Sequence, residues 1–317
     1  MIASLLLGIF TFVQLNCENF FDCVHDSLKQ DTEYTEGGMR HWNANRYWKK
    51  LRNISKEIVA CSAVGDAGLP VVPDLVALCE IENDSVAHYL TRRAPLRNAR
   101  YEYVMTSSPD VRGIDVALLY SPMSFRLISS KSLRIAPLKG MRPTRDILYA
   151  EGELISGDTL HVFVVHAPSR FGGKRATTPF RMAVAERLTE SVDSIRALHP
   201  EALIIVSGDF NDETHDKALQ HVTNRRLTDI SFGAKGSNGA KGTYKYQGIW
   251  QSIDHILISD RLKRMLLSCR INDMPFLLEE DTRYGGMKPL RTFNGYRYLG
   301  GYSDHLPLVA CFRIGDD

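Results

Sequence analysis

Polar side chains that could do chemistry stand at the ends of apolar runs in this sequence of 317 residues. Four of them come at the C-terminal ends of such runs: Asn16, Glu80, His166 and Asp209. Others come at the starts of further runs: Asp115, Asp254, Asp304 and His305. If all of them line one rim, the first four strands run toward that rim and the others run away from it.

The residue types at this rim favour a hard divalent cation. Carboxylate and amide oxygens suit Mg²⁺ or Mn²⁺, whereas zinc and copper favour sulfur or several imidazoles. Two carboxylates about 4 Å apart repel by roughly 4 kcal/mol at an effective dielectric of about 20, and a bound cation would remove that penalty. Glu80, which ends an apolar strand, is therefore the first expected metal ligand.

Short apolar runs rich in Val, Ile and Leu predict the strands that position these side chains. Each run is bounded by polar or turn-forming residues, as expected of buried strands. The predicted strands cover residues 10–16, 74–81, 115–120, 147–154, 160–166, 202–207, 253–259 and 305–312.

Two segments have the three-and-four spacing of apolar residues that is typical of an amphipathic helix. The first segment contains Tyr47, Leu51, Ile54, Ile58 and Cys61. The second segment contains Phe180, Val184, Leu188, Val192 and Ile195. The second helix is predicted to begin with Thr178 as N-cap and Pro179 at the first helical position.

The order of these elements predicts two sheets rather than one. The first helix separates Asn16 from Glu80, and the second separates His166 from Asp209, so each pair belongs to a crossover unit with parallel strands. Strands that run in both directions require mixed, mostly antiparallel sheets. Two similar halves predict an α/β fold with four layers, an α/β/β/α sandwich with the helices outside.

Composition and charge are those of an ordinary globular protein. Hydrophobic residues make up 44% and charged residues 24%, which excludes collagen-like and disordered classes. A pI near 8.2 falls short of the value of about 9 that marks a nucleic-acid-binding domain, so a nucleic-acid role would need a local basic patch. The six cysteines have no C-x-x-C spacing, which argues against structural zinc.

The N-terminus carries a short apolar stretch, which we interpret as an N-terminal extension or the remnant of a signal peptide over residues 1–9. It is too short to span a bilayer, which needs about 20 apolar residues. A cytoplasmic and an exported location both remain open. No linker or repeat divides residues 10–317, so we predict one domain that acts as a monomer without a protein partner.

Six short segments resemble, in order, the motifs of the endonuclease/exonuclease/phosphatase superfamily, whose fold is that of deoxyribonuclease I. The group includes pancreatic deoxyribonuclease, abasic-site endonucleases, neutral sphingomyelinases and inositol-polyphosphate 5-phosphatases. The segments are LNCENFFD at 15–22, LCEIEN at 78–83, VHAP at 165–168, SGDFND at 207–212, SIDH at 252–255 and SDHLP at 303–307.

The resemblance implies a role for each motif residue. Mg²⁺ or Mn²⁺ is the implied cofactor, and its implied ligands are Asn16, Glu80 and Asp304. Asp209 would orient or deprotonate the attacking water, and Asn211 would contact phosphate oxygens. His305 would be the catalytic imidazole, held in the right tautomer by Asp254. Strand alternation turns Glu18, Glu82 and His255 away, so they are left out of the site.

Three further positions complete the expected site. His166 would stabilise the pentavalent phosphorane or protonate the leaving group. A His here is typical of the deoxyribonuclease, phosphatase and sphingomyelinase branches, whereas abasic-site endonucleases usually carry Asn. Asp115 stands where family members place a substrate-facing residue. Arg170 lies in a loop after a motif and could grip a phosphate through two hydrogen bonds, although a solvated charge is the simpler interpretation.

The expected function is hydrolysis of phosphate esters by in-line attack of a water molecule, with a divalent cation neutralising charge. A catalytically silent binding module on the same fold is the alternative from another class. Within the enzyme class, a nuclease or other phosphodiesterase competes with a phosphomonoesterase or lipid phosphodiesterase. The expected partner is a phosphate-ester substrate, with nucleic acid as one candidate, and no membrane span is expected.

Overall fold

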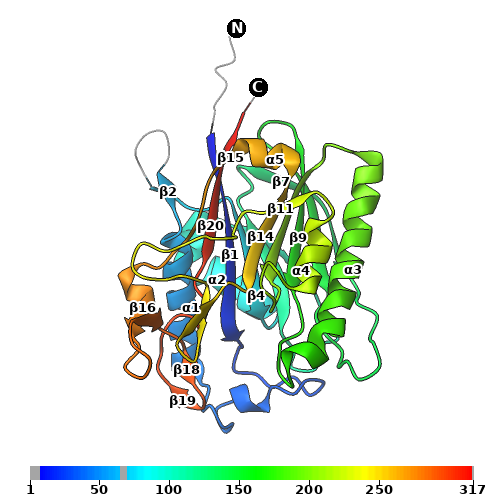
Figure 1. Ribbon diagram of the computed structural model, residues 1–317. Helices are drawn as coiled ribbons and strands as arrows, with labels where there is room; N and C mark the ends of the chain where they lie inside the picture. The colour runs from blue at the N-terminus through cyan, green and yellow to red at the C-terminus, as the bar shows by residue number, and fades with distance from the viewer. Residues whose placement is uncertain (1–7, 65–69, 316–317) are drawn as a thin grey trace.

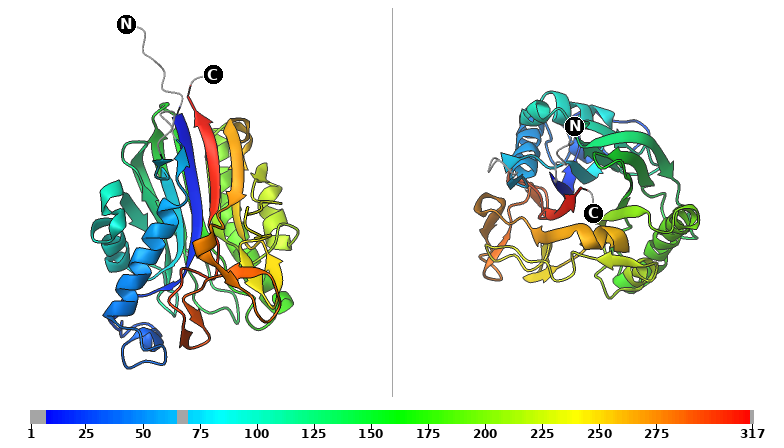
Figure 2. Two further views of the ribbon diagram at one scale, coloured as in Figure 1. Left: turned by 90° about the vertical axis from the view of Figure 1, so that its left-hand side faces the viewer. Right: turned by 90° about the horizontal axis from the view of Figure 1, so that it is seen from above.

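Two six-stranded sheets pack face to face in the computed structural model, which describes residues 8–64 and 70–315. The main helices lie on the outer faces of the two sheets (Figures 1 and 2). The arrangement is the predicted α/β/β/α sandwich. Each sheet contains a single parallel pair, and its other neighbours are antiparallel, so the expectation of mixed, mostly antiparallel sheets is confirmed.

The first sheet has the strand order β15-β20-β1-β4-β6-β5, with β1 and β4 as its parallel pair. These two strands are central and are joined through the first long helix. The strands are β1 (Gly8–Phe20), β4 (Leu75–Ile81), β5 (Glu102–Met105), β6 (Asp115–Tyr120), β15 (Leu266–Ile271) and β20 (Leu308–Ile314).

The second sheet has the order β11-β14-β10-β9-β8-β7, with β9 and β10 as its parallel pair. The second long helix connects these two strands. The strands are β7 (Phe125–Leu133), β8 (Ile147–Leu154), β9 (Thr159–His166), β10 (Leu203–Asp209), β11 (Leu227–Asp229) and β14 (Asp254–Ser259).

Within the described residues, five α-helices and four small hairpins surround the sheets. The helices are α1 (Ala44–Val59), α2 (Asp84–Arg92), α3 (Lys174–Leu198), α4 (Lys217–Thr223) and α5 (Asp260–Met265). The hairpins pair β2 (Ala63–Val64) with β3 (Pro70–Val71), β12 (Tyr244–Tyr246) with β13 (Ile249–Gln251), β16 (Leu278–Glu280) with β17 (Met287–Pro289), and β18 (Phe293–Asn294) with β19 (Arg297–Tyr298).

Side-chain alternation along the central strands builds three apolar layers. Phe12 of β1 and Ile205 of β10 lie in the layer between the two sheets. Leu15 faces the layer under α1 and α2, and Val206 faces the layer under α3 and α4. Because both faces of these strands are buried, the strands read as nearly continuous apolar runs. The charged groups of the central strands β1, β4, β9 and β10 therefore lie near the ends of these strands.

Most predicted strands agree with the structure, and the differences lie at their ends. The strand expected to begin at His305 begins at Leu308, and His305 makes only an isolated bridge to Tyr244. The first helix ends at Val59, so Cys61 lies beyond it, although its side chain is buried. The edge strands β5, β7, β11 and β15 were not predicted, because they are short or contain polar residues that interrupt the apolar signal.

The predicted start of the second helix is wrong. The helix begins at Lys174, and Pro179 lies within it instead of at its first position. Side chains satisfy carbonyls of the extra turn: the hydroxyl of Thr178 donates to the oxygen of Lys174 at 2.8 Å, and Arg181 donates to the same oxygen at 3.0 Å. Pro179 cannot donate to the carbonyl of Arg175, and these bonds give the first turn additional hydrogen bonds next to that gap.

The N-terminal segment interpreted as an extension lies mostly outside the described residues, which begin at Gly8. Gly8 and Ile9 already belong to β1, where they pair with Ile314 and Arg313 of β20. Over residues 8–64 and 70–315, no helix has both the length and the apolar character needed to cross a membrane.

We predict that Gly208→Ala lowers the free energy of unfolding by about 2–4 kcal/mol. Gly208 has a φ of +151°, and a Cβ atom there would lie 1.8 Å from the carbonyl oxygen of Val165 on the neighbouring strand. Urea unfolding measures the change. Gly37→Ala is the matched control, because a Cβ at Gly37 meets nothing within 4 Å. Equal stability of the two variants would show that β9 and β10 do not approach as described.

Candidate active site

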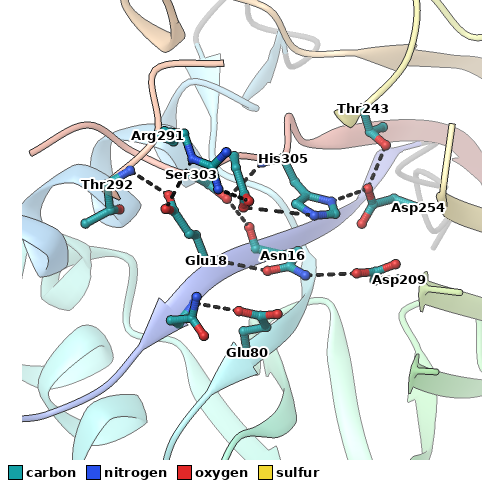
Figure 3. Close-up of polar contacts among 12 residues, drawn as sticks. Asn16, Glu18, Glu80, Asp209, Thr243, Asp254, Arg291, Thr292, Ser303 and His305 are labelled. Atoms are coloured by element: carbon teal, nitrogen blue, oxygen red, sulfur yellow. Dashed lines mark hydrogen bonds and ion pairs between the residues drawn. The ribbon is translucent and has the colours of Figure 1, made fainter. Parts of the chain in front are cut away.

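The parallel strands β1 and β4 bring Asn16 and Glu80 to one rim of the first sheet. The pairing between them is interrupted by a bulge, where Glu18, Asn19 and Glu80 adopt positive φ values of 49°, 52° and 61°. The backbone N–H of Asn19 donates to Oε2 of Glu80 at 2.7 Å (Figure 3). The bulge therefore fixes the Glu80 carboxylate through the backbone of the irregular end of β1.

The parallel strands β9 and β10 bring His166 and Asp209 to the same place from the second sheet. Nε2 of His166 lies 3.8 Å from Oε1 of Glu80 and 3.7 Å from Oδ2 of Asp209. The side chain of Asn16 donates to Oδ2 of Asp209 at 3.0 Å. Four residues from four strands in two sheets thus converge, as their positions at strand ends predicted.

Burial sets the charge of this cluster. Burial raises the pKa of Asp209 to about 7, and the nearby Asp254 carboxylate acts in the same direction. Burial also lowers the pKa of His166 well below 6.5, and Arg145 and Arg112 add to this effect. The imidazole of His166 is therefore neutral at pH 7, and it cannot offset the charge of the two carboxylates beside it.

A second cluster pairs Asp254, at the start of β14, with His305. Nδ1 of His305 donates to Oδ2 of Asp254 at 2.7 Å, and the hydroxyl of Thr243 donates to the same oxygen at 2.6 Å (Figure 3). Gln14 approaches the other oxygen at 3.5 Å. The contact expected between a carboxylate and an imidazole separated by about fifty residues is therefore present, with Thr243 as an additional donor.

The pKa of His305 is shifted in the opposite direction from the pKa of His166. Burial alone would lower the pKa of His305, but the Asp254 carboxylate raises that pKa well above 6.5. Burial alone would raise the pKa of Asp254, and the His305 cation brings it below its usual value. The pair is therefore an imidazolium–carboxylate pair at neutral pH. The ring of Tyr244 packs against His305 with centroids 4.9 Å apart.

Asp304 lies near Nε2 of His305, whereas Asp254 contacts Nδ1 of the same ring. Its Oδ1 is 4.0 Å from Nε2 of His305, and its Oδ2 accepts from Arg291 at 2.7 Å. Glu18, which strand alternation was expected to turn away, is buried near the same arginine and accepts from the backbone of Thr292 at 2.5 Å. The positive φ of Glu18 breaks the alternation, so that expectation is corrected.

Asn211 contacts Asp209 but does not continue its strand. β10 ends at Asp209, and Asn211 has a φ of 50°. The side chain of Asn211 therefore does not follow the alternation of a regular strand. The backbone N–H of Asn211 donates to Oδ1 of Asp209 at 2.8 Å, and its side chain donates to the oxygen of Ala167 at 3.1 Å. Phe210 is buried in the core.

Asp115 and Arg170 both make internal contacts. The buried carboxylate of Asp115 accepts from Thr106 at 2.5 Å and from the backbone and hydroxyl of Ser108, so it holds a turn, and its substrate-facing role stays a prediction. Arg170 donates to the oxygen of Asn211 at 2.6 Å and to Asp216 at 3.1 Å. Its guanidinium therefore braces the Asn211 loop.

His255 and Glu82 lie outside the cluster, in agreement with the sequence. His255 is fully buried and bonds Asp229 at 2.9 Å and the oxygen of Asp212 at 2.9 Å. Glu82 accepts from the backbone of Asp22 at 2.6 Å. Both side chains are bound to structural partners.

One group of three side chains meets the spacing needed to hold a metal ion, since ligand atoms of Asp209, Asp254 and His305 lie within 4.8 Å of one another. The acids Asp254 and Asp209 differ in their partners, however. Asp254 already pairs with His305, whereas Asp209 and Glu80 have only the neutral His166 within ion-pair distance among the residues described. The chemistry of the donors therefore points to Glu80 and Asp209, with the amide of Asn16 beside them.

Comparison with known proteins identifies the family of this chain. The family model described as "Endonuclease/Exonuclease/phosphatase family" matches residues 11–313. The chain belongs to this family. No curated protein sequence matches the chain.

Solved structures with similar folds come from the same family. The truncated TDP2 of Caenorhabditis elegans has a TM-score of 0.59 at 16% identity, covering 96% of this chain and 98% of that one. The human Nocturnin catalytic domain with bound sulfate has a TM-score of 0.57 at 19% identity, covering 98% and 94%. A mannosyl-6-phosphatase of Bacteroides thetaiotaomicron has a TM-score of 0.59 at 15% identity, covering 95% and 98%. At these identities the likeness establishes the fold.

Two residues near the endonuclease/exonuclease/phosphatase motifs were missed from the sequence. Thr243 precedes the short strand β12 and carries no motif of its own. Arg291 lies in the irregular segment between β17 and β18. Thr243 follows Gly242, and a Cβ at Gly242 would lie 2.5 Å from the oxygen of Gln251. The glycine directly before a hydroxyl residue is the sequence signal that could have pointed to Thr243.

We predict that Asp254→Asn lowers the pKa of His305, which NMR titration of the imidazole in chelator would measure. The folded-state pKa of His305 is raised, so the stability that the pair contributes is present below about pH 6.5 and is lost as pH rises through that folded pKa. The pKa of Asp254 is lowered, so at the acid end the contribution is lost as pH falls below about 3.8. The stability difference between wild type and variant should be largest between these limits.

Asp229→Asn is the matched control, because it removes the carboxylate from the other buried pair, Asp229 with His255. It should shift the pKa of His255 and leave His305 unchanged. An unaltered His305 titration in Asp254→Asn would contradict the assignment of this pair.

Proposed function

We propose that this protein hydrolyses phosphate esters with the help of a divalent cation, Mg²⁺ or Mn²⁺. The observation that carries the proposal is the convergence of two uncompensated carboxylates, Glu80 and Asp209, with an imidazolium, His305, at one rim. Negative oxygens suit a hard cation, and a fixed positive charge suits a phosphate that gains charge in the transition state. A binding module would have no need for such an arrangement of charges.

The cation site is assigned to Glu80, Asn16 and Asp209. A bound Mg²⁺ would neutralise charge on the phosphate and lower the pKa of an attached water. Asp209 is placed to orient the attacking water and to accept its proton, because the side chain of Asn16 and the backbone of Asn211 hold its carboxylate at the rim. Asn211 bonds Asp209 through its backbone and keeps that carboxylate oriented.

The two imidazoles take different tasks in this proposal. His305 is charged and held by Asp254 through Nδ1, so its Nε2–H is available to stabilise developing negative charge or to protonate the leaving group. His166 is neutral and buried, so it acts as a hydrogen-bonding group beside the phosphate and not as an acid. This assignment narrows the two roles that the sequence left open for His166.

The substrate class is tested with a panel in the presence of Mg²⁺ or Mn²⁺. The panel contains duplex DNA, abasic DNA, single-stranded RNA, bis-p-nitrophenyl phosphate, sphingomyelin, inositol phosphates and, because one solved relative is a mannosyl-6-phosphatase, phosphorylated mannose. Hydrolysis of a diester or monoester outside abasic-site repair is expected. Incision of abasic DNA that exceeds cleavage of every other substrate by orders of magnitude would reverse this ranking.

We predict that activity on the preferred substrate disappears in EDTA and that Glu80→Gln reduces affinity for the cation by about 10-fold or more. The amide keeps the shape of the side chain and can still accept from Asn19, while one charge is lost. Melting in chelator should be no lower than for wild type, because repulsion is relieved. Glu82→Gln is the matched control and should retain cation affinity. Full activity in EDTA would exclude the proposal.

We also predict that Asp254 and His305 act as one unit in catalysis. His305→Ala, Asp254→Ala and the double variant should each lose a similar, large part of kcat, about 10²-fold or more, because each removes the same imidazolium. Measured kcat values of the three variants decide the question. A double variant whose loss equals the product of the single losses would mean that the two residues act independently.

A further inference from the structure

The carboxylates around the proposed site differ in whether a cation of the protein already pairs with them. Asp254 pairs with His305, and Asp304 pairs with Arg291 through Nη2 at 2.7 Å. Glu18 lies 3.7 Å from Nε of the same arginine. Among the residues that the structure describes, Glu80 and Asp209 have no Lys or Arg nitrogen within 4.0 Å. The proposed site therefore divides into a side where a protein cation contacts the carboxylates and a side where Arg112, which interacts with Glu80, stays beyond ion-pair distance.

Arg291 is held in place by its own chain segment. The two residues that follow it donate their backbone N–H groups to Glu18, Thr292 at 2.5 Å and Phe293 at 3.0 Å (Figure 3). The buried amine of Lys50 donates to the hydroxyl of Thr292 at 2.6 Å. These bonds fix the segment at the rim, so the guanidinium is positioned before any ligand arrives.

The guanidinium is also buried in part and incompletely bonded. Its Nε is buried without a hydrogen-bond partner in the described part of the chain, while the side chain as a whole is 33% exposed. Arg291 therefore faces the rim with one edge on Asp304. An arginine keeps its charge at every physiological pH, unlike a histidine in the same position.

We propose that Arg291 is a built-in cation that takes the place of a second metal ion, so that the site binds a single divalent cation on the side of Glu80 and Asp209. In this proposal Asp304 is the partner of Arg291 and not a metal ligand, which differs from the role that the family resemblance gave it. The inference rests on the proposed metal-dependent function. Its physical basis is repulsion, because a divalent cation next to Asp304 would lie beside a fixed guanidinium that already neutralises the carboxylate.

In the reaction, the positive charge on one side of the site would come from the bound cation, and on the other side it would come from Arg291. The side with Glu80 gains its positive charge only when a cation binds. The side with Asp304 is positive or neutral at all times, and Arg291 positions Asp304 beside Nε2 of His305, 4.0 Å away. Arg291 is thus a positioning residue for the pair that handles the leaving group.

The test is the stoichiometry of Mn²⁺ binding to the full chain without substrate, by calorimetry and by electron paramagnetic resonance of the free ion. Wild type should bind one ion. Asp304→Asn should also bind one ion with its Kd within about threefold of wild type, whereas Glu80→Gln should weaken that ion by about 10-fold or more. Arg291→Ala should bind a second ion, because Asp304 and Glu18 then lose the guanidinium that interacts with both of them.

Arg291→Lys and Arg297→Ala are the matched controls. The lysine keeps the charge and should keep one ion, and the exposed Arg297 lies nearby in β19, so its removal tests a general loss of positive charge. Two ions in wild type, one ion in Arg291→Ala, or loss of the ion in Asp304→Asn would each overturn the inference. Metal-dependent hydrolysis with two bound ions would leave the proposed function intact, and one bound ion without hydrolysis of any substrate would leave the inference intact.

Discussion

The structure depends on one constraint, which is that buried carboxylates must be placed where two parallel strand pairs end together. Each parallel pair needs a long crossover, and α1 and α3 are parts of these crossovers. Because the two sheets pack face to face, the ends of β1 and β4 lie opposite those of β9 and β10. Asn16, Glu80, His166 and Asp209 then converge without any long loop. The polar cluster is therefore a consequence of topology, and the apolar layers on both faces of the sheets hold it in place.

A buried acid elsewhere in the chain has more hydrogen-bond donors than Asp209. Asp273 accepts from the backbone of Ser237, Asn238 and Ala240. Several hydrogen bonds stabilise the charged form of a buried carboxylate. Asp209 has one backbone donor and the amide of Asn16, yet its pKa remains raised. An acid kept in this state favours a ligand that carries positive charge, and stability alone gives no reason to retain it.

The sequence was sufficient to predict the central strands of both sheets and the meeting of Asn16, Glu80, His166 and Asp209 at one rim, because both follow from strand ends. Apolar runs located the ends of β4 and β9 to within a residue, and the motifs at those ends identified Glu80 and His166. Alternation failed wherever the backbone left the strand, as at Glu18 and Asn211, since a positive φ cannot be read from periodicity. The position of Asp115 at a strand end did not reveal the hydrogen-bond donors of the neighbouring loop, and its contact with substrate stays a prediction.

Arg291 could not be found from the sequence, and the reason is physical. It lies in a segment without strand or helix periodicity, and its contact with Asp304 depends on how that segment folds back. The donors from Thr292 and Phe293 to Glu18 decide this, and they exist only because the bulge in β1 turns Glu18 inward. One irregularity in a central strand thus sets the position of a cation almost three hundred residues later.

The two histidines of the site show how environment separates identical side chains into different chemical tasks. His166 and His305 are both buried, and burial alone would make both neutral. His305 has a full carboxylate on Nδ1 and becomes a cation, whereas His166 has arginines nearby, its Nδ1 has no partner within the described residues, and it stays neutral. Groups whose pKa values are driven apart in this way are those that can act as proton donor and as neutral hydrogen-bonding group at the same pH. Exchange of their neighbours, and not of the imidazoles, would exchange their tasks.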